Sequence, residues 1–179
     1  IEYVRALNNG STSNTEMKNS LYLSYDYTWN NLSLGAGLRY EHIRSDLREN
    51  NSNKNQNQTY HNFLPSVSLS YNTENLQQSL TYSVHTERPP FGVMNDNAVY
   101  TDRFTYQKGN LYLKQALTHD LNYMLFYKFL FFNLNYTHTH NPLITAFYSM
   151  PGNSAVTVSY MDNFDRMHTV SYTHLRAHE

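Results

Sequence analysis

Apolar and polar residues alternate along eight stretches of this chain. A period of two is typical of a β-strand with one face in apolar and the other in polar surroundings. No segment carries apolar residues at helical spacing over three turns, and the strand formers Tyr, Thr, Val and Phe dominate the patterned stretches. The pattern predicts an all-β protein of about eight strands, at residues 1–7, 21–27, 32–41, 63–71, 76–85, 119–127, 132–139 and 155–161.

The connections between these predicted strands alternate between short and long. Short turns are predicted at 29–31, 72–75 and around 128, and polar loops at 8–16, 48–58, 88–113 and 150–153. Transmembrane β-barrels have this arrangement, with tight turns at one end and long loops at the other. The alternation extends over about 9–14 residues, which fits the ~9–11 tilted residues that cross a bilayer. We therefore expect an antiparallel up-and-down meander that forms part of a larger transmembrane β-barrel.

The composition agrees with strands that separate a lipid-facing side from a wet side. The chain has 17 Tyr and 9 Phe, a mean hydropathy of −0.67, and no apolar run near the ~20 residues of a membrane helix. Aromatic residues gather at predicted strand ends, at 25–29 and 129–132, as in the interfacial girdles of barrels. A soluble sandwich would also alternate, but with strands of ~5–6 residues.

Charge and cysteine content exclude other classes of protein. The formal net charge is −1, so no basic face predicts a nucleic-acid partner. The absence of cysteine excludes a disulfide framework and zinc sites with cysteine ligands.

Both ends of the chain differ from the ends of a natural outer-membrane protein. The chain begins within a strand pattern, without an initiator Met or the signal peptide that such a protein needs. Residues 170–179 match, residue for residue, one translated frame of a transposon-end adaptor used in sequencing libraries. We expect residues 1–169 to be an internal piece of a barrel domain and residues 170–179 to be derived from the adaptor.

Several short motifs, in order along the chain, resemble the outer-membrane β-barrel family of TonB-dependent receptor-like proteins. In that family a Leu-Pro-Ser strand is followed by a Tyr-Ser strand ending in Arg-Pro, and then by a Thr-Tyr…Gly-Asn-Pro-x-Leu-x-Pro segment. The matching residues are Leu64, Pro65, Ser66, Tyr82, Ser83, Arg88, Pro89, Tyr100, Thr101, Asp102, Phe104, Thr105, Tyr106, Gly109, Asn110, Leu113 and Lys114. Residues 37–41 resemble the family's Gly-Leu-Arg-x-Glu strand, residues 160–166 resemble its Tyr-x-Asn-x-Asp turn, and Leu111 departs from the pattern, which has Pro there.

This resemblance implies a location in the outer membrane of a Gram-negative bacterium and a slice of a receptor barrel of 22 strands. Such a barrel takes up a scarce large solute, such as a chelate, a glycan or a peptide. It implies an N-terminal plug and the TonB complex as partners, in addition to outer-membrane lipid and in some cases a surface lipoprotein. No cofactor is implied.

Candidate binding residues lie in the loop 88–113, because long loops on a rigid scaffold carry recognition. Aromatic and charged side chains occur together there, at Phe91, Asp96, Tyr100, Asp102, Arg103, Phe104 and Tyr106. The alternation also predicts Arg39 and Glu41 on the lumen-facing side of one strand, as an ion pair.

Other motifs receive a structural interpretation. His138 and His140 share one strand face, but the sequence offers no third ligand, so no metal site is predicted. Gly109 and Asn110 predict a turn with positive φ, and Pro89 predicts the end of a strand. No catalytic spacing is present, so no enzyme is predicted.

A passive porin or structural barrel, and less favourably a soluble adhesin or glycan-binding module, remain as alternative functions.

Overall fold

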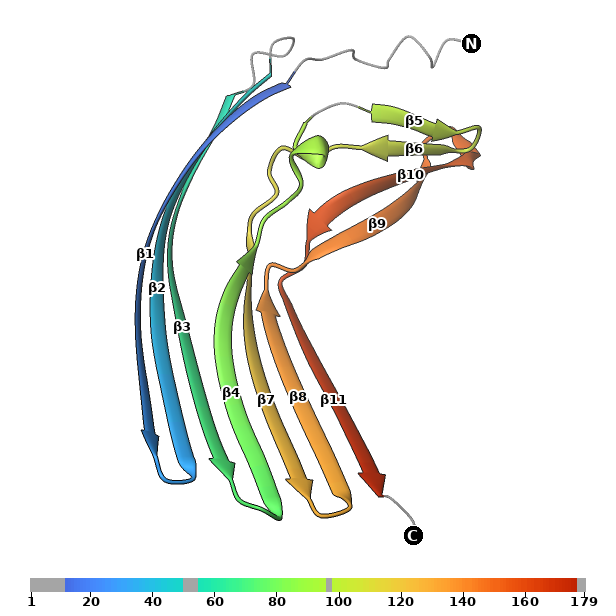
Figure 1. The fold of residues 1–179 in the computed structure, drawn as a ribbon. Helices are drawn as coiled ribbons and strands as arrows, with labels where there is room; N and C mark the ends of the chain where they lie inside the picture. The colour runs from blue at the N-terminus through green and yellow to red at the C-terminus, as the bar shows by residue number, and fades with distance from the viewer. Residues whose placement is uncertain (1–11, 50–54, 96–97, 177–179) are drawn as a thin grey trace.

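The computed structural model describes residues 12–49, 55–95 and 98–176 and shows a curved, open sheet with a smaller sheet at one end (Figure 1). The large sheet has the order β1-β2-β3-β4-β7-β8-β11. Its strands are β1 (Thr12–Trp29), β2 (Leu32–Glu49), β3 (Asn55–Asn72), β4 (Leu76–Glu87), β7 (Ala116–Tyr127), β8 (Leu130–His140) and β11 (Arg166–Arg176). All pairings within it are antiparallel. Among the described residues no helix is long and apolar enough to cross a membrane.

The smaller sheet is formed by the two long connections of the chain and has the order β5-β6-β10-β9. It contains β5 (Ala98–Asp102), β6 (Thr105–Lys108), β9 (Leu143–Met150) and β10 (Asn153–Asn163), and the short 3₁₀ helix η2 (Phe91–Val93) precedes it. β6 and β10 pair in parallel, with Thr105 opposite Thr157. The first connection is therefore joined to the second by backbone hydrogen bonds.

The predicted alternation separates the two faces of the large sheet. On the convex face apolar residues lie opposite each other across the strands, as in Leu23 with Leu38 and Leu34 with Leu69, and many of these large apolar side chains are exposed. On the concave face the opposing residues are polar, as in Ser66 with Ser83. The fold class is confirmed: the sheet is an antiparallel meander and an unclosed part of a barrel.

Short turns join the strands at the end of the sheet away from the smaller sheet, which we call the short-turn end (Figure 1). Asn30 and Lys128 each have a φ of 52°, a left-handed conformation that a tight hairpin needs and that Asn tolerates well. The third turn is closed by Thr73, whose backbone N–H donates to the Leu76 carbonyl at 2.7 Å. The opposite end, with the long connections, we call the loop end.

The strands near the loop end are longer than predicted. The loops predicted at 8–16 and 48–58 were wrong in their described parts, because β1 begins at Thr12, β2 continues to Glu49 and β3 begins at Asn55. Residues on both faces are polar there, so the pairing leaves no period of two in the sequence. β5, β6, β9 and β11 were not predicted either, and the strand predicted at 1–7 lies outside the described residues. The origin of residues 170–179 stays a prediction, because an alternating peptide pairs with an open sheet edge whatever its source.

A small apolar core holds the first long connection against the concave face of β2. It consists of Leu47, Met94, Leu111 and Leu113, all nearly inaccessible to solvent, with Val93, Leu143 and Met161 packed beside them. Leu47 belongs to β2 and Met161 to β10, so the core joins the wall of the barrel to both long connections.

Substituting Leu113 by Ala tests this core. Leu113 is 0 % exposed, and removing a buried Leu side chain costs about 2–5 kcal/mol. We expect faster hydrogen exchange across residues 88–115 in the complete barrel, measured by mass spectrometry. Tyr112→Ala is the control, because Tyr112 is 70 % exposed. Equal exchange in both variants would contradict the role of this core.

The large sheet has two open edges, at β1 and β11. Unpaired backbone groups are costly in lipid, where no water can hydrogen-bond them. We therefore expect the 179-residue chain, refolded alone in detergent, to lack the heat-modifiable gel shift and protease resistance of a closed barrel. A stable band that shifts on boiling would show that this chain closes by itself.

Candidate functional site on the concave face

Glu41 is the centre of a charge cluster on the concave face. Its side chain is 0 % exposed. Lys18 Nζ of β1 lies 2.8 Å from Glu41 Oε1, and Arg39 Nε donates to the same oxygen at 2.6 Å. Two cations share one carboxylate, so this part of the concave face carries an excess of positive charge. Arg39 and Glu41 therefore contact each other, and Lys18 is a partner that the sequence did not indicate.

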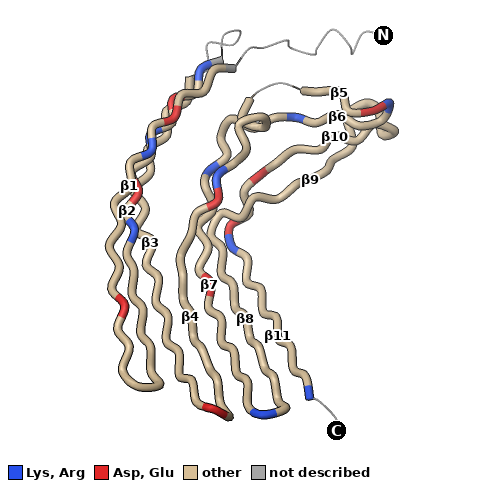
Figure 2. The backbone as a smooth tube through the Cα atoms, viewed as in Figure 1, with Lys and Arg blue, Asp and Glu red and all other residues tan. Residues whose placement is uncertain are grey.

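A second ion pair fixes the start of the first long connection. Arg88 follows the last residue of β4, and its guanidinium pairs with the carboxylate of Glu16 in β1. The prediction that the strand ends before Pro89 is confirmed, since β4 ends at Glu87. Figure 2 shows that charged residues gather in the loop half of β1–β3 and are sparse in the short-turn half.

These charges border a hollow of about 560 Å³ on the concave face. Among the residues that line it are Lys18, Tyr22, Arg39, Ser66, His85 and Arg88. Three of these side chains are permanent cations, each paired with Glu41 or Glu16, and the others supply hydroxyl and imidazole groups. Glu87 adds a carboxylate to the lining, so the hollow is suited to a hydrophilic ligand group such as one with many hydroxyls.

Gly37 makes room beside this hollow for Tyr22. A Cβ at Gly37 would lie 2.6 Å from Ser66 Oγ and 3.3 Å from Tyr22 Oη. The first distance is shorter than real Cβ contacts, so a larger residue would displace Ser66. Glycine thus lets the tyrosine ring lie across the neighbouring strand.

The predicted loop residues fall into separate groups in the structure. Tyr100 of β5 and Tyr106 of β6 face each other, with ring centroids 5.6 Å apart and a ring angle of 70°. At the end of β5 the Asp102 carboxylate accepts the Phe104 N–H at 2.8 Å, and in the following turn the Arg103 guanidinium lies 5.7 Å from the Phe104 ring centroid.

Two other loop candidates lie apart from these groups. Phe91 is in η2 and is half exposed. Asp96 lies outside the described residues. The structure therefore brings the aromatic candidates together only in part, and their role in binding stays a prediction.

The Gly-Asn motif has a different role from the predicted one. Among the described glycines, Gly152 has a positive φ and Gly109 does not, so the prediction of a turn with positive φ was wrong. A Cβ at Gly109 would lie 2.3 Å from the Asn95 carbonyl oxygen, so glycine is needed for close backbone approach. Asn110 then donates from Nδ2 to the Met161 carbonyl of β10 at 3.2 Å.

Asn163 of the Tyr-x-Asn-x-Asp motif completes this link between the two long connections. Its Oδ1 accepts the Lys114 N–H at 2.7 Å, and its Nδ2 donates to the Lys114 carbonyl at 3.0 Å. Nδ2 also lies 2.8 Å from the Asn141 carbonyl. These motif residues hold the loop end together. Lys114 and Asn163 are 49 residues apart in the sequence, so no local sequence pattern could have predicted their contact.

On the convex face, His138 and His140 lie beside two further histidines. His138 Nε2 is 2.9 Å from His140 Nε2. His119 of β7 and His168 of β11 are directly opposite His138 on either side. Across the described ranges, no group of three or more His, Asp or Glu side chains is positioned to hold a metal ion.

The family model "Outer membrane protein beta-barrel family" matches residues 3–174. The chain therefore belongs to this family of outer-membrane β-barrels and is located in the outer membrane of a Gram-negative bacterium. No curated protein matches it significantly.

Among solved structures, the hemophore receptor HasR of Serratia marcescens, determined with its hemophore HasA and heme, is similar in fold. The TM-score is 0.66 at 12 % identity, over 89 % of this chain and 31 % of HasR. The siderophore receptor PirA of Pseudomonas aeruginosa gives a TM-score of 0.49 at 12 % identity, over 92 % of this chain and 39 % of PirA. The chain thus spans 31 % of HasR, and the prediction that it forms part of a larger β-barrel is confirmed at the level of the fold.

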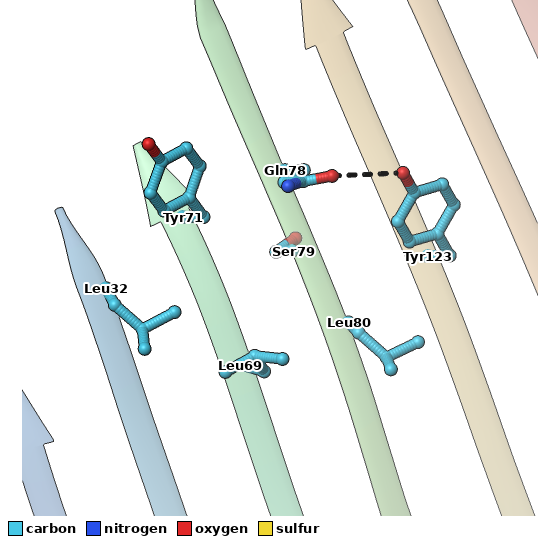
Figure 3. A pocket seen from close by; sticks show the side chains of 7 residues that line it. All are labelled: Leu32, Leu69, Tyr71, Gln78, Ser79, Leu80 and Tyr123. Carbon is cyan, nitrogen blue, oxygen red and sulfur yellow. Dashed lines mark hydrogen bonds between the residues drawn. The ribbon is translucent and has the colours of Figure 1, made fainter. Parts of the chain in front are cut away.

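A second hollow, of about 420 Å³, lies at the short-turn end and has a different environment. It is lined by Leu32, Leu69, Tyr71, Gln78, Ser79, Leu80 and Tyr123. Figure 3 shows the Tyr123 hydroxyl donating to Gln78 Oε1 at 3.3 Å above the leucine side chains. These leucines belong to the apolar convex face, which contacts lipid in an outer-membrane barrel. We therefore assign this hollow to lipid acyl chains and not to a polar ligand.

The Glu41 cluster gives a test of the concave face. Glu41→Gln removes the charge but keeps the shape, and it leaves Lys18 and Arg39 close together without their shared carboxylate. We expect a loss of about 1–3 kcal/mol in the free energy of unfolding, measured by urea titration of the complete barrel. Glu74→Gln in an exposed turn is the matched control. Equal midpoints for the two variants would show that the cluster does not stabilise the barrel.

Proposed function

We propose that this chain is part of the barrel of a TonB-dependent receptor that takes up a scarce large solute, such as a chelate, a glycan or a peptide. The observation that carries this proposal is the folded sheet that the two long connections form at the loop end of the large sheet (Figure 1). In outer-membrane barrels the long loops face the cell exterior. The smaller sheet is therefore in the position where a solute first meets the protein.

The construction of the loop end favours recognition over passive flow. The parallel pairing of β6 with β10 and the hydrogen bonds of Asn110 and Asn163 fix the two long connections relative to each other. A fixed surface loses less conformational freedom on binding than a mobile loop does. Paired tyrosines on such a surface suit sugar rings, chelates and peptides, because each ring offers an apolar face and a hydroxyl group.

The complete protein would have further partners. An N-terminal plug would close the barrel, the TonB complex would supply energy, and a surface lipoprotein would be a further candidate partner. HasR, which is similar in fold, is described as a receptor in complex with a protein hemophore and heme. A receptor with a large ligand on a similar fold is consistent with the proposal.

Uptake in cells with and without a working TonB complex tests the proposal. Cells that express the complete protein are given a panel of labelled ferric chelates, oligosaccharides and peptides. We expect one class to accumulate only when TonB is active. Accumulation without TonB, limited by solute size, would instead indicate a passive porin, and binding without uptake would indicate an adhesin.

Tyr100 and Tyr106 give a residue-level test. Replacing both by Ala removes the paired ring surface, and one aromatic contact is worth about 0.5–1.5 kcal/mol, so we expect the loss of two rings to weaken binding of the solute about tenfold. Affinity is measured on purified barrel. Val99→Ala is the control, because Val99 is exposed on the other face of β5. Unchanged affinity in the double variant would remove these residues from the binding surface.

A further inference from the structure

Four histidines meet on the convex face at the loop end of β7, β8 and β11. His119, His138 and His168 occupy one row across the three strands, and His140 follows two residues later on the same face of β8. The ring centroid of His138 is 4.4 Å from that of His140 and 6.1 Å from that of His119, and His119 and His140 are 6.2 Å apart. We propose that His119, His138 and His140 bind a divalent transition-metal ion of the Zn²⁺ type through their Nε2 atoms.

The other ring nitrogens of His119 and His138 are held by neighbouring side chains, whereas the Nε2 atoms of His138 and His140 contact each other and would exchange that contact for the metal. His119 Nδ1 is held by the Tyr82 hydroxyl at 2.9 Å. His138 Nδ1 lies 3.2 Å from His168 Nδ1, which in turn contacts the Tyr136 hydroxyl at 2.8 Å. Ligating histidines in proteins almost always have their second nitrogen held by such a partner, which fixes the ring and its tautomer.

The spacing of the rings fits an ion of this size after a small movement. Tetrahedral ligands at 2.0–2.1 Å have nitrogens about 3.3 Å apart and ring centroids about 5 Å apart. The Nε2 atoms of His138 and His140 lie at 2.9 Å, so they must separate by about 0.4 Å. His119 must turn toward them, since in the described part of the chain no three-ligand arrangement is already complete. All three side chains are only half-buried, so these rotations meet little packing resistance.

The same contacts favour a site that binds a metal cation over a site that binds phosphate. A hydrogen bond between two imidazole nitrogens requires one of them to be an unprotonated acceptor. His138 makes such contacts through both of its nitrogens, so each contact needs at least one neutral ring, which is the form that binds metals. Arg166 lies opposite His140 and opposes a cation, but it pairs with Asp165 at 3.4 Å. Imidazole ligands suit Zn²⁺, Cu²⁺ and Ni²⁺.

The test uses the complete barrel, without a histidine affinity tag, in detergent and in nanodiscs of neutral phospholipid. Zn²⁺ binding is measured by calorimetry, and the Cu²⁺-loaded protein is examined by electron paramagnetic resonance, in which coordinated imidazole nitrogens are counted. We expect one tight site and signals from three nitrogens. His140→Gln and His119→Gln should each weaken Zn²⁺ binding at least tenfold, and Tyr82→Phe should weaken it less.

His42→Gln is the matched control, because His42 is on the same convex face with His61 as its neighbour, ring centroids 4.8 Å apart. It should leave the affinity unchanged, and the gel shift on boiling confirms that each variant is folded. Signals from fewer than three nitrogens in the unmodified protein would overturn the proposal without reference to any variant. Zn²⁺ binding in His140→Gln and His119→Gln that is as strong as in the unmodified protein would also overturn it. So would Zn²⁺ binding that appears only when a phosphorylated glycolipid is added to the nanodiscs.

Discussion

Backbone pairing between neighbouring strands is the constraint on which this structure depends. In a bilayer every N–H and C=O group needs a partner within the protein, and a sheet supplies these partners only between adjacent strands. The register of the seven-stranded sheet therefore determines which residues face lipid and which face the lumen. A shift by one residue would move Leu34 and Leu69 to the wet side and Ser33 and Ser70 to the lipid side.

The central parts of the strands could be predicted because there the two faces have opposite surroundings. Leu32 to Tyr40 and Phe63 to Tyr71 alternate clearly, and the turns at Asn30 and Lys128 were placed correctly. The ends of the strands could not be predicted in the same way. Residues such as Asp46 and Asn57 pair across β2 and β3, but both faces are polar there and the period disappears.

The candidate sites depend on contacts that are distant in sequence. Arg39 and Glu41 could be paired from their spacing of two on one strand, whereas Lys18 joins them only through the register of β1 with β2. His138 and His140 were visible as neighbours, but His119 reaches them only because β7 and β8 form a hairpin of the observed register. Gly109 was recognised as special, although its reason is the nearby Asn95 backbone and not its own φ.

The parallel pairing of β6 with β10 also constrains how such a protein can evolve. Loops at the outer surface of a cell usually change length freely, because an insertion in one loop leaves the others undisturbed. Here an insertion near Thr105 would shift the strand that Thr157 pairs with. Lineages that diversify this surface must therefore alter the two loops together or confine their changes to the hairpin tips, such as Arg103–Phe104 and Pro151–Gly152.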